Sequence, residues 1–202
     1  MGITLPTAGQ SAWATPLNAA LEDLQDAGPV ANDAAFLSWN YAPFNIIGAS
    51  SAITSGTVVM ARLPRFTQDK SVASVHFHVA AAAVTPTAGQ CFAGLYNAAG
   101  TRMGVSADIG SSLTSTGLKA VTLSAPAACP VGDYWVAVLQ NAATPATLGV
   151  CSSQGVADVM NAGLTAATAF FTDGPTAQTS LPASVTMASR TVSARAVWAG
   201  AK

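Results

Sequence analysis

The chain has 202 residues, of which 50% are hydrophobic and only 8% are charged, and its formal net charge is −1. This balance excludes the basic surface of a nucleic-acid-binding protein and an acidic interaction tail. The apolar runs are shorter than the ~18 residues of a membrane-spanning helix. A surface so poor in charge is covered by small polar residues or by partners, so we expect an oligomer or a larger assembly.

The first predicted elements are a polar arm over residues 1 to about 12 and then a short helix. Thr15 can cap this helix, Pro16 suits its first position, and Gly28-Pro29 ends it. Its apolar stripe consists of Leu17, Leu21 and Leu24. Because a helix of about a dozen residues is marginal alone, this stripe needs a surface to pack on. That surface is its own domain, an identical chain or a different protein.

A connector follows the helix, and it is unusually rich in aromatic side chains. These are Phe36, Trp39, Tyr41 and Phe44. So many rings in a loop-like segment indicate that it is anchored on a surface. We place a domain boundary between residues 54 and 55. The part before it is expected to attach and oligomerise the chain, and residues 55–202 are expected to form a β-sandwich that folds by itself.

From residue 57 onward, short alternating or apolar runs recur between turn residues, which is typical of antiparallel strands. The predicted strands are Val58–Phe66, Ser71–Val79, Cys91–Asn97, Met103–Ile109, Gly117–Leu123, Tyr134–Gln140, Thr147–Ser152 and Thr191–Trp198. The segment Asp158–Phe171 fits neither a strand nor a helix well. The predicted fold is mainly β: an antiparallel, jelly-roll-like β-sandwich preceded by an N-terminal arm and one short helix.

His76-Phe77-His78 is the one motif with metal-ligand chemistry. On a strand, residues i and i+2 share a face, so the two imidazoles could bind one metal ion. A cupin-type site also needs a downstream Glu and a further His, and neither follows position 78. We therefore expect a solvent-facing pair and no metal or other cofactor, with His76 and His78 as weak candidate ligands.

Other chemistry has little support in the sequence. There is no G-x-S-x-G motif, and Asp133 and Asp173 each adjoin a glycine, as turn residues do. We expect no enzymatic activity. The three cysteines are expected to be small buried hydrophobes: Cys91, Cys129 and Cys151. Four aromatic residues could form a sugar-stacking platform but are expected in the core: Tyr96, Tyr134, Trp135 and Trp198.

Two parts of the chain resemble structural proteins of tailed bacteriophages. The segments Gly94–Thr101, Ser115–Leu123 and Pro130–Leu139 resemble a β-sandwich domain of minor tail proteins and fibres, especially in phages that infect actinobacteria. The N-terminal segment resembles the virion-attaching end of tail-fibre proteins in its spacing of Pro6, Gly9, Trp13, Leu17, Asn18 and Leu21. The long stalks of typical fibres are absent from this sequence.

The resemblance implies a non-enzymatic virion protein of minor tail or fibre type. It would be a homotrimer, made in the host cytoplasm without a signal peptide, with an outward sandwich that binds a host-surface glycan. It implies oligomerisation and attachment to other virion proteins through Trp13, Leu17, Asn18, Leu21 and Leu24. Some phage fibres bind iron through a His-x-His motif from each of three chains, which is the metal alternative for His76 and His78. A capsid decoration protein (a head fibre) and a cellular carbohydrate-binding module are the other interpretations.

Overall fold

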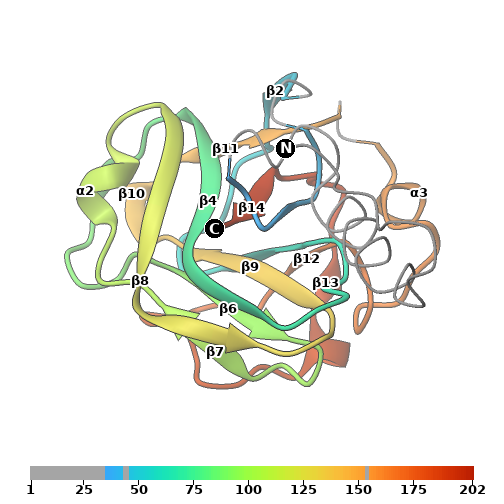
Figure 1. Ribbon diagram of the computed structural model, residues 1–202. Helices are drawn as coiled ribbons and strands as arrows, with labels where there is room; N and C mark the ends of the chain where they lie inside the picture. The colour runs from blue at the N-terminus through green and yellow to red at the C-terminus, as the bar shows by residue number, and fades with distance from the viewer. Residues whose placement is uncertain (1–34, 43–45, 153–154) are drawn as a thin grey trace, which may run out of the picture.

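The computed structural model describes residues 35–42, 46–152 and 155–202 (Figure 1). The fold is mainly β with antiparallel sheets, as the sequence predicts. The predicted arm and helix lie outside the described residues, and so do Trp13, Leu17, Asn18, Leu21, Leu24 and Phe44. Within the described part of the chain, no helix is long and apolar enough to cross a bilayer.

The first sheet is organised around β4 (Lys70–Ala81), which pairs with three other strands. On one edge β4 pairs with β8 (Gly117–Cys129). Along its other edge it pairs first with β14 and further on with β11. β1 pairs with β14 and β2 with β11, so the connected path of strands is β1-β14-β4-β11-β2. Its remaining strands are β1 (Ser38–Trp39), β2 (Gly48–Ala49), β11 (Thr147–Val150) and β14 (Ala199–Ala201). All of these pairings are antiparallel.

The second sheet has the order β13-β12-β3-β9-β6-β7 and is also antiparallel. Its strands are β3 (Val58–Arg62), β6 (Phe92–Asn97), β7 (Arg102–Val105), β9 (Tyr134–Leu139), β12 (Phe171–Asp173) and β13 (Thr191–Val192). A separate ladder pairs β5 (Val84–Pro86) with β10 (Ala142–Thr144). The short helices are α2 (Gly110–Leu113), α3 (Ala157–Met160) and the 3-10 helix η2 (Met187–Ser189).

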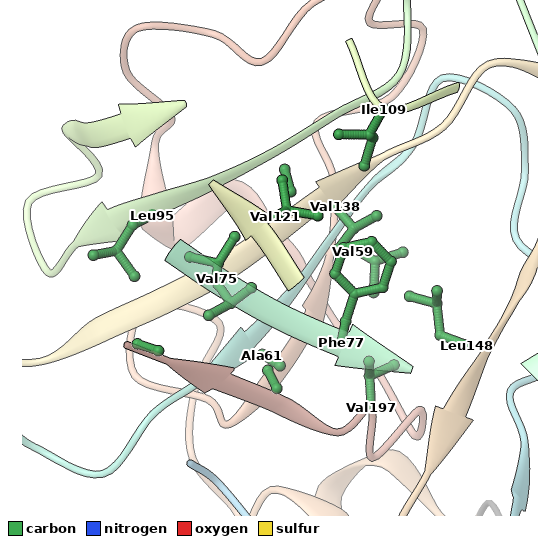
Figure 2. Close-up of a cluster of buried hydrophobic side chains, with 14 of the residues drawn as sticks. Val59, Ala61, Val75, Phe77, Leu95, Ile109, Val121, Val138, Leu148 and Val197 are labelled. Atoms are coloured by element: carbon green, nitrogen blue, oxygen red, sulfur yellow. The ribbon is translucent and has the colours of Figure 1, made fainter. Parts of the chain in front are cut away.

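The main core lies between the two sheets, in a sandwich-like arrangement. The alternation of β4 places Val75, Phe77 and Val79 in this core, fully buried, while Ser74, His76 and His78 share the opposite face, as predicted. Figure 2 shows residues of β4 gathered in one cluster with Val59 and Ala61 of β3 and Val138 of β9. The chain crosses repeatedly between the sheets, from β3 to β4 and from β8 to β9 for example.

A second core covers the other face of the second sheet. Met60 of β3, Tyr96 of β6 and Trp135 of β9 are buried there beneath Leu181, Val185 and Met187 from the segment before β13. Both faces of β9 are therefore buried, which explains why its sequence, YWVAVL, is apolar throughout and does not alternate.

The predicted closing strand at Thr191–Trp198 is wrong. Only its first two residues belong to β13, and the chain then turns and forms β14 at Ala199–Ala201. The turn includes Arg195, whose backbone N–H donates to Ser193 Oγ and whose guanidinium binds Asp173 and the carbonyl of Ala52. These tertiary contacts override the local alternation. The undecided segment Asp158–Phe171 forms most of α3, several turns and the first residue of β12.

The aromatic connector packs on the sandwich from residue 35 onward. β1 pairs with β14, and the rings of Phe36 and Trp39 form a buried cluster with Trp198. Ile53 belongs to the main core. The expectation that Phe36 and Trp39 are anchored on a surface is confirmed, and that surface is the first sheet. The expected boundary between residues 54 and 55 lies downstream of these strands and contacts.

Candidate functional site

The histidine motif lies on the outer face of β4, but it differs from the expected solvent-facing pair. His76 is only 4% exposed, and His78 is half-buried. The ring of Phe36 covers His76 edge-on at a centroid distance of 4.8 Å. Gly200 of β14 makes this possible, because a Cβ at that position would lie 2.8 Å from Phe36 Cε1. Burial, helped by Lys202, lowers the pKa of His76 to about 4.

Ser74 and His76 form a pair that resembles part of a catalytic triad. Ser74 Oγ lies 2.9 Å from His76 Nε2, but no described group hydrogen-bonds to His76 Nδ1. A base with so low a pKa accepts a proton poorly at neutral pH, and no carboxylate in the described part of the chain orients the ring as a triad requires. Within the described ranges, no three His, Cys, Asp or Glu side chains gather as metal ligands. This arrangement gives His76 a packing role.

The other residues singled out from the sequence lie in the interior. Trp198 and Tyr96 are fully buried, and Trp135 and Tyr134 nearly so, which confirms the core interpretation and excludes a sugar-stacking platform at these positions. Cys91 and Cys129 are buried, Cys151 is half-buried, and all three are free thiols. Burial raises the pKa of Cys129 to about 11 and that of Cys151 to about 12, so both thiols are unreactive at neutral pH.

A surface cleft of about 210 Å³ forms where β1, β3 and β12 come together, and we call it the Arg62 cleft. Its walls combine aromatic rings, two guanidinium groups and an amide: Tyr41, Phe170, Phe171, Arg62, Arg65 and Asn40. Leu63 and Pro64 connect the two arginines. The cleft is smaller than the ~300 Å³ at which pockets for drug-sized ligands begin, so it has room for a single ring-sized group.

The two arginines are placed by the end of β3. Pro64 cannot donate a hydrogen bond to a sheet ladder, so the strand ends at Arg62. Leu63 and Phe66 on either side are buried and fix the backbone, while Arg65 between them points outward and is 60% exposed. Asp133 lies between the two guanidinium groups. Its Oδ1 is 2.8 Å from Arg62 Nη2, and its Oδ2 is 3.5 Å from Arg65 Nη1.

Phe170 reaches the cleft because its loop is held by three donors. Arg190 donates to the carbonyl of Ala166, Arg62 to that of Thr168, and the Trp135 indole to that of Ala169. The guanidinium carbons of Arg62 and Arg190 lie 5.4 and 5.3 Å from the Trp135 ring centre. Burial lowers the pKa of Arg190 to about 10, so it stays charged at neutral pH. The loop leaves Phe170 38% exposed, with Arg62 also over its ring at 5.6 Å.

The third wall of the cleft is the segment after β1. Asn40 fixes it by donating from Nδ2 to the carbonyl of Val197 and accepting at Oδ1 from the N–H of Ala199. The Trp198 indole donates to the carbonyl of Tyr41. Tyr41 then stacks on Phe171 with an interplanar angle of 12°. Burial, and to a lesser degree Cys151, raises the pKa of the Tyr41 phenol, which therefore remains protonated and able to donate.

The Arg62 cleft is not predicted from the sequence. Its residues come from three distant segments, and no single segment contains a recognisable motif. Two local signals were present, however. Arg62-Leu63-Pro64-Arg65 places two of the eight basic residues close together, and two consecutive rings, Phe170 and Phe171, stand where β12 begins, the first exposed and the second buried. Aromatic faces beside fixed guanidinium groups suit a flat or ring-shaped polar ligand.

Comparisons with protein-family models, with curated proteins and with solved structures find no match to this chain.

Proposed function

We propose that this chain is a non-enzymatic structural protein of a bacteriophage virion, of minor tail or fibre type, whose sandwich binds a host-surface glycan. The observation that carries the binding part is the Arg62 cleft. It offers two partly exposed rings, Tyr41 and Phe170, beside the guanidinium groups of two arginines. Tyr41 is fixed by stacking on Phe171, and the arginine wall is fixed by the ion pair between Arg62 and Asp133. The virion part rests on the resemblance of the sequence to tail proteins.

The cleft suits a sugar for three physical reasons. The apolar face of a sugar ring packs on an aromatic ring, and Phe170 presents such a ring to solvent. Guanidinium donors bind sugar oxygens, and Arg65 presents such donors at the rim of the cleft. The wall beside it is ordered before any ligand arrives, because Arg62 is bound to Asp133 and to the Thr168 carbonyl. The volume of about 210 Å³ admits one ring at a time, as expected for recognition of one residue in a chain of sugars.

A glycan array carrying bacterial surface polysaccharides tests the binding part of the proposal. The full chain should bind at least one polysaccharide, and Phe170→Ala should weaken that binding about tenfold or more. Val159→Ala is the matched control, because it removes a 74% exposed apolar side chain on α3, outside the cleft. Absence of binding to every polysaccharide, or equal binding by the Phe170 variant, would contradict the proposal.

The assembly part is that the chain forms a homotrimer and attaches to other virion proteins through Trp13, Leu17, Asn18, Leu21 and Leu24. These residues lie outside the described part, so sequence alone supports this step. Light scattering should give a mass about three times the 20.2 kDa of one chain. Leu21→Asp should lower that mass or prevent attachment to particles, and normal assembly of this variant would contradict the role of the stripe.

Tail and capsid positions are separated by locating the chain on the particle. Antibody labelling seen by electron microscopy should place the chain on the tail if it is a fibre or tip component. Labelling of the head would contradict the tail role and support the capsid decoration role. Absence of the chain from purified particles would contradict both roles. The remaining interpretation would then be a cellular carbohydrate-binding module.

A further inference from the structure

We infer that the sugar bound in the Arg62 cleft carries an anionic group, a carboxylate or a phosphate, and that Arg65 binds it. This inference rests on the proposed glycan-binding function and adds the chemical class of the ligand. It is carried by the difference between the two arginines of the cleft. The guanidinium of Arg62 is occupied by protein partners, whereas that of Arg65 is largely exposed.

The charges at the cleft do not balance. Arg62 and Arg65 line it, and the described residues that line it include no carboxylate. Asp133 lies beside both arginines and compensates only one of the two positive charges. The chain as a whole has a net charge of −1, so this local positive charge is not the result of a generally basic composition. An anionic ligand would supply the missing charge.

Arg62 has little capacity left for a ligand. Its Nη2 is 2.8 Å from Asp133 Oδ1, its Nη1 donates to the Thr168 carbonyl at 2.9 Å, and its plane lies over Trp135 and Phe170. These contacts make Arg62 part of the wall. It orients Asp133 and the loop that carries Phe170, and it contributes mainly its positive field to the cleft.

Arg65 has the opposite character. It is 60% exposed, and its contact with Asp133 is long, at 3.5 Å. A guanidinium group has five N–H donors in a planar fork, which matches the two oxygens of a carboxylate or phosphate. Buried Leu63 and Phe66 hold its backbone at the rim of the cleft. Arg65 can therefore bind the charged substituent while Tyr41 and Phe170 contact the ring.

The test compares the full chain with matched pairs of methyl glycosides by NMR titration. The pairs are glucuronide with glucoside, galacturonide with galactoside, and mannuronide with mannoside, and glucose 6-phosphate distinguishes phosphate from carboxylate. At least one anionic sugar should bind tenfold or more tightly than its neutral partner. Raising the salt concentration should weaken the binding of the anionic sugar and not that of the neutral one.

The variant Arg65→Gln should bring the affinity for the anionic sugar down to that of its neutral partner. Arg65→Lys should retain part of the preference, because it keeps the charge but loses the planar fork. Lys119→Gln on β8 is the control for a general loss of positive charge and should leave the preference unchanged.

Two outcomes would overturn the inference, and they are distinguishable. Equal binding of the anionic and neutral sugars, with loss of both in Phe170→Ala, would remove the anion preference while the glycan site stands. Absence of binding by every sugar tested, together with a negative glycan array, would overturn the inference and the proposed function together.

Discussion

Arg62 and Trp135 face each other as cross-strand partners on β3 and β9, and the guanidinium carbon of Arg62 lies 5.4 Å from the indole ring centre. Arg190 lies over the same ring at 5.3 Å. The indole is thus in contact with two cations, and its N–H donates to the Ala169 carbonyl. The cleft wall depends on this cluster, because the same loop carries Phe170.

The first prediction concerns the planar guanidinium of Arg62. Arg62→Lys should lower the free energy of unfolding by about 1–2 kcal/mol, because an ammonium group cannot stack on Trp135 while binding both Asp133 and the Thr168 carbonyl. Arg65→Lys is the matched control and should change stability by less than about 0.5 kcal/mol, as exposed substitutions do. Urea unfolding measures both, and an equal effect of the two substitutions would contradict the structural role of Arg62.

The second prediction compares two glycines that share a positive φ. Gly100 has φ of 80°, and a Cβ there would overlap the Val185 carbonyl oxygen, whereas Gly89 has φ of 71° and a Cβ there would have nothing within 4 Å. Gly89→Ala should cost about 1 kcal/mol for the left-handed conformation alone. Gly100→Ala should cost at least about 2 kcal/mol more, because the Gly100–Val185 contact must open. Similar urea midpoints for the two variants would contradict this prediction, because they would show that the Val185 backbone moves away from Gly100 at little cost in stability.

A third prediction concerns the aromatic cluster upstream of residue 54. Phe36→Ala should destabilise the fold by about 3 kcal/mol, because it removes a buried ring that contacts Trp39, His76 and Trp198. Phe170→Ala, at a more exposed ring, should cost less than about 1 kcal/mol. Thermal unfolding followed by circular dichroism measures both.

The same cluster tests the domain boundary. A chain that begins at Thr54 lacks β1, β2 and Ile53 and would uncover Trp198, so we expect lower stability or insolubility. A chain that begins at Ala35 retains these elements and should fold. If the shorter chain is as soluble and unfolds as cooperatively as the longer one, the sandwich from residue 55 is autonomous, as the sequence predicts.

The last prediction is a pH dependence due to His76. Its pKa is about 4 in the folded chain, below the ordinary 6.5, so the unfolded chain takes up the proton first as the pH falls. Stability is therefore lost as the pH decreases from about 6.5 to about 4, by up to about 3 kcal/mol at 1.4 kcal/mol per pKa unit. His78, whose pKa burial also lowers, contributes in the same direction.

His76→Gln should remove most of this slope, and His78→Gln should remove less. The measurement is urea unfolding at several pH values between 4 and 7, with the difference between variant and wild type as the readout, so that the titration of carboxylates cancels. An unchanged slope in His76→Gln would mean that the imidazole is accessible to protons in the folded chain.

The strands that the sequence predicts well are those whose own alternation or apolar run is sufficient. β6 and β9 lie within one residue of their expected bounds and β4 within two, because each has a long apolar face that only one register can bury. The two- and three-residue strands β1, β2, β5 and β10 carry no such pattern. These short segments are strands only because they pair with distant strands in the sheets, so the local sequence does not predict them.

The site was harder to predict for the same reason. The burial of His76 depends on the ring of Phe36 and on the missing side chain at Gly200, both far from it in sequence. The Arg62 cleft needs Tyr41, Arg65 and Phe170 to meet, and nothing in the individual segments indicates that they do. Local patterns determine which face of a strand is buried, whereas tertiary contacts determine which exposed residues become neighbours.

The pairing of Ser38 with Ala201 has a consequence for the order of folding. It joins two of the most distant segments of the described chain, and β4 likewise pairs with β14 and β11, which come much later. Closing such long loops costs entropy before the contacts form, so the first sheet should close late and slowly. A circular permutant that links residue 202 to residue 35 would make the β1–β14 pairing local, and it should refold faster than the natural order of the chain.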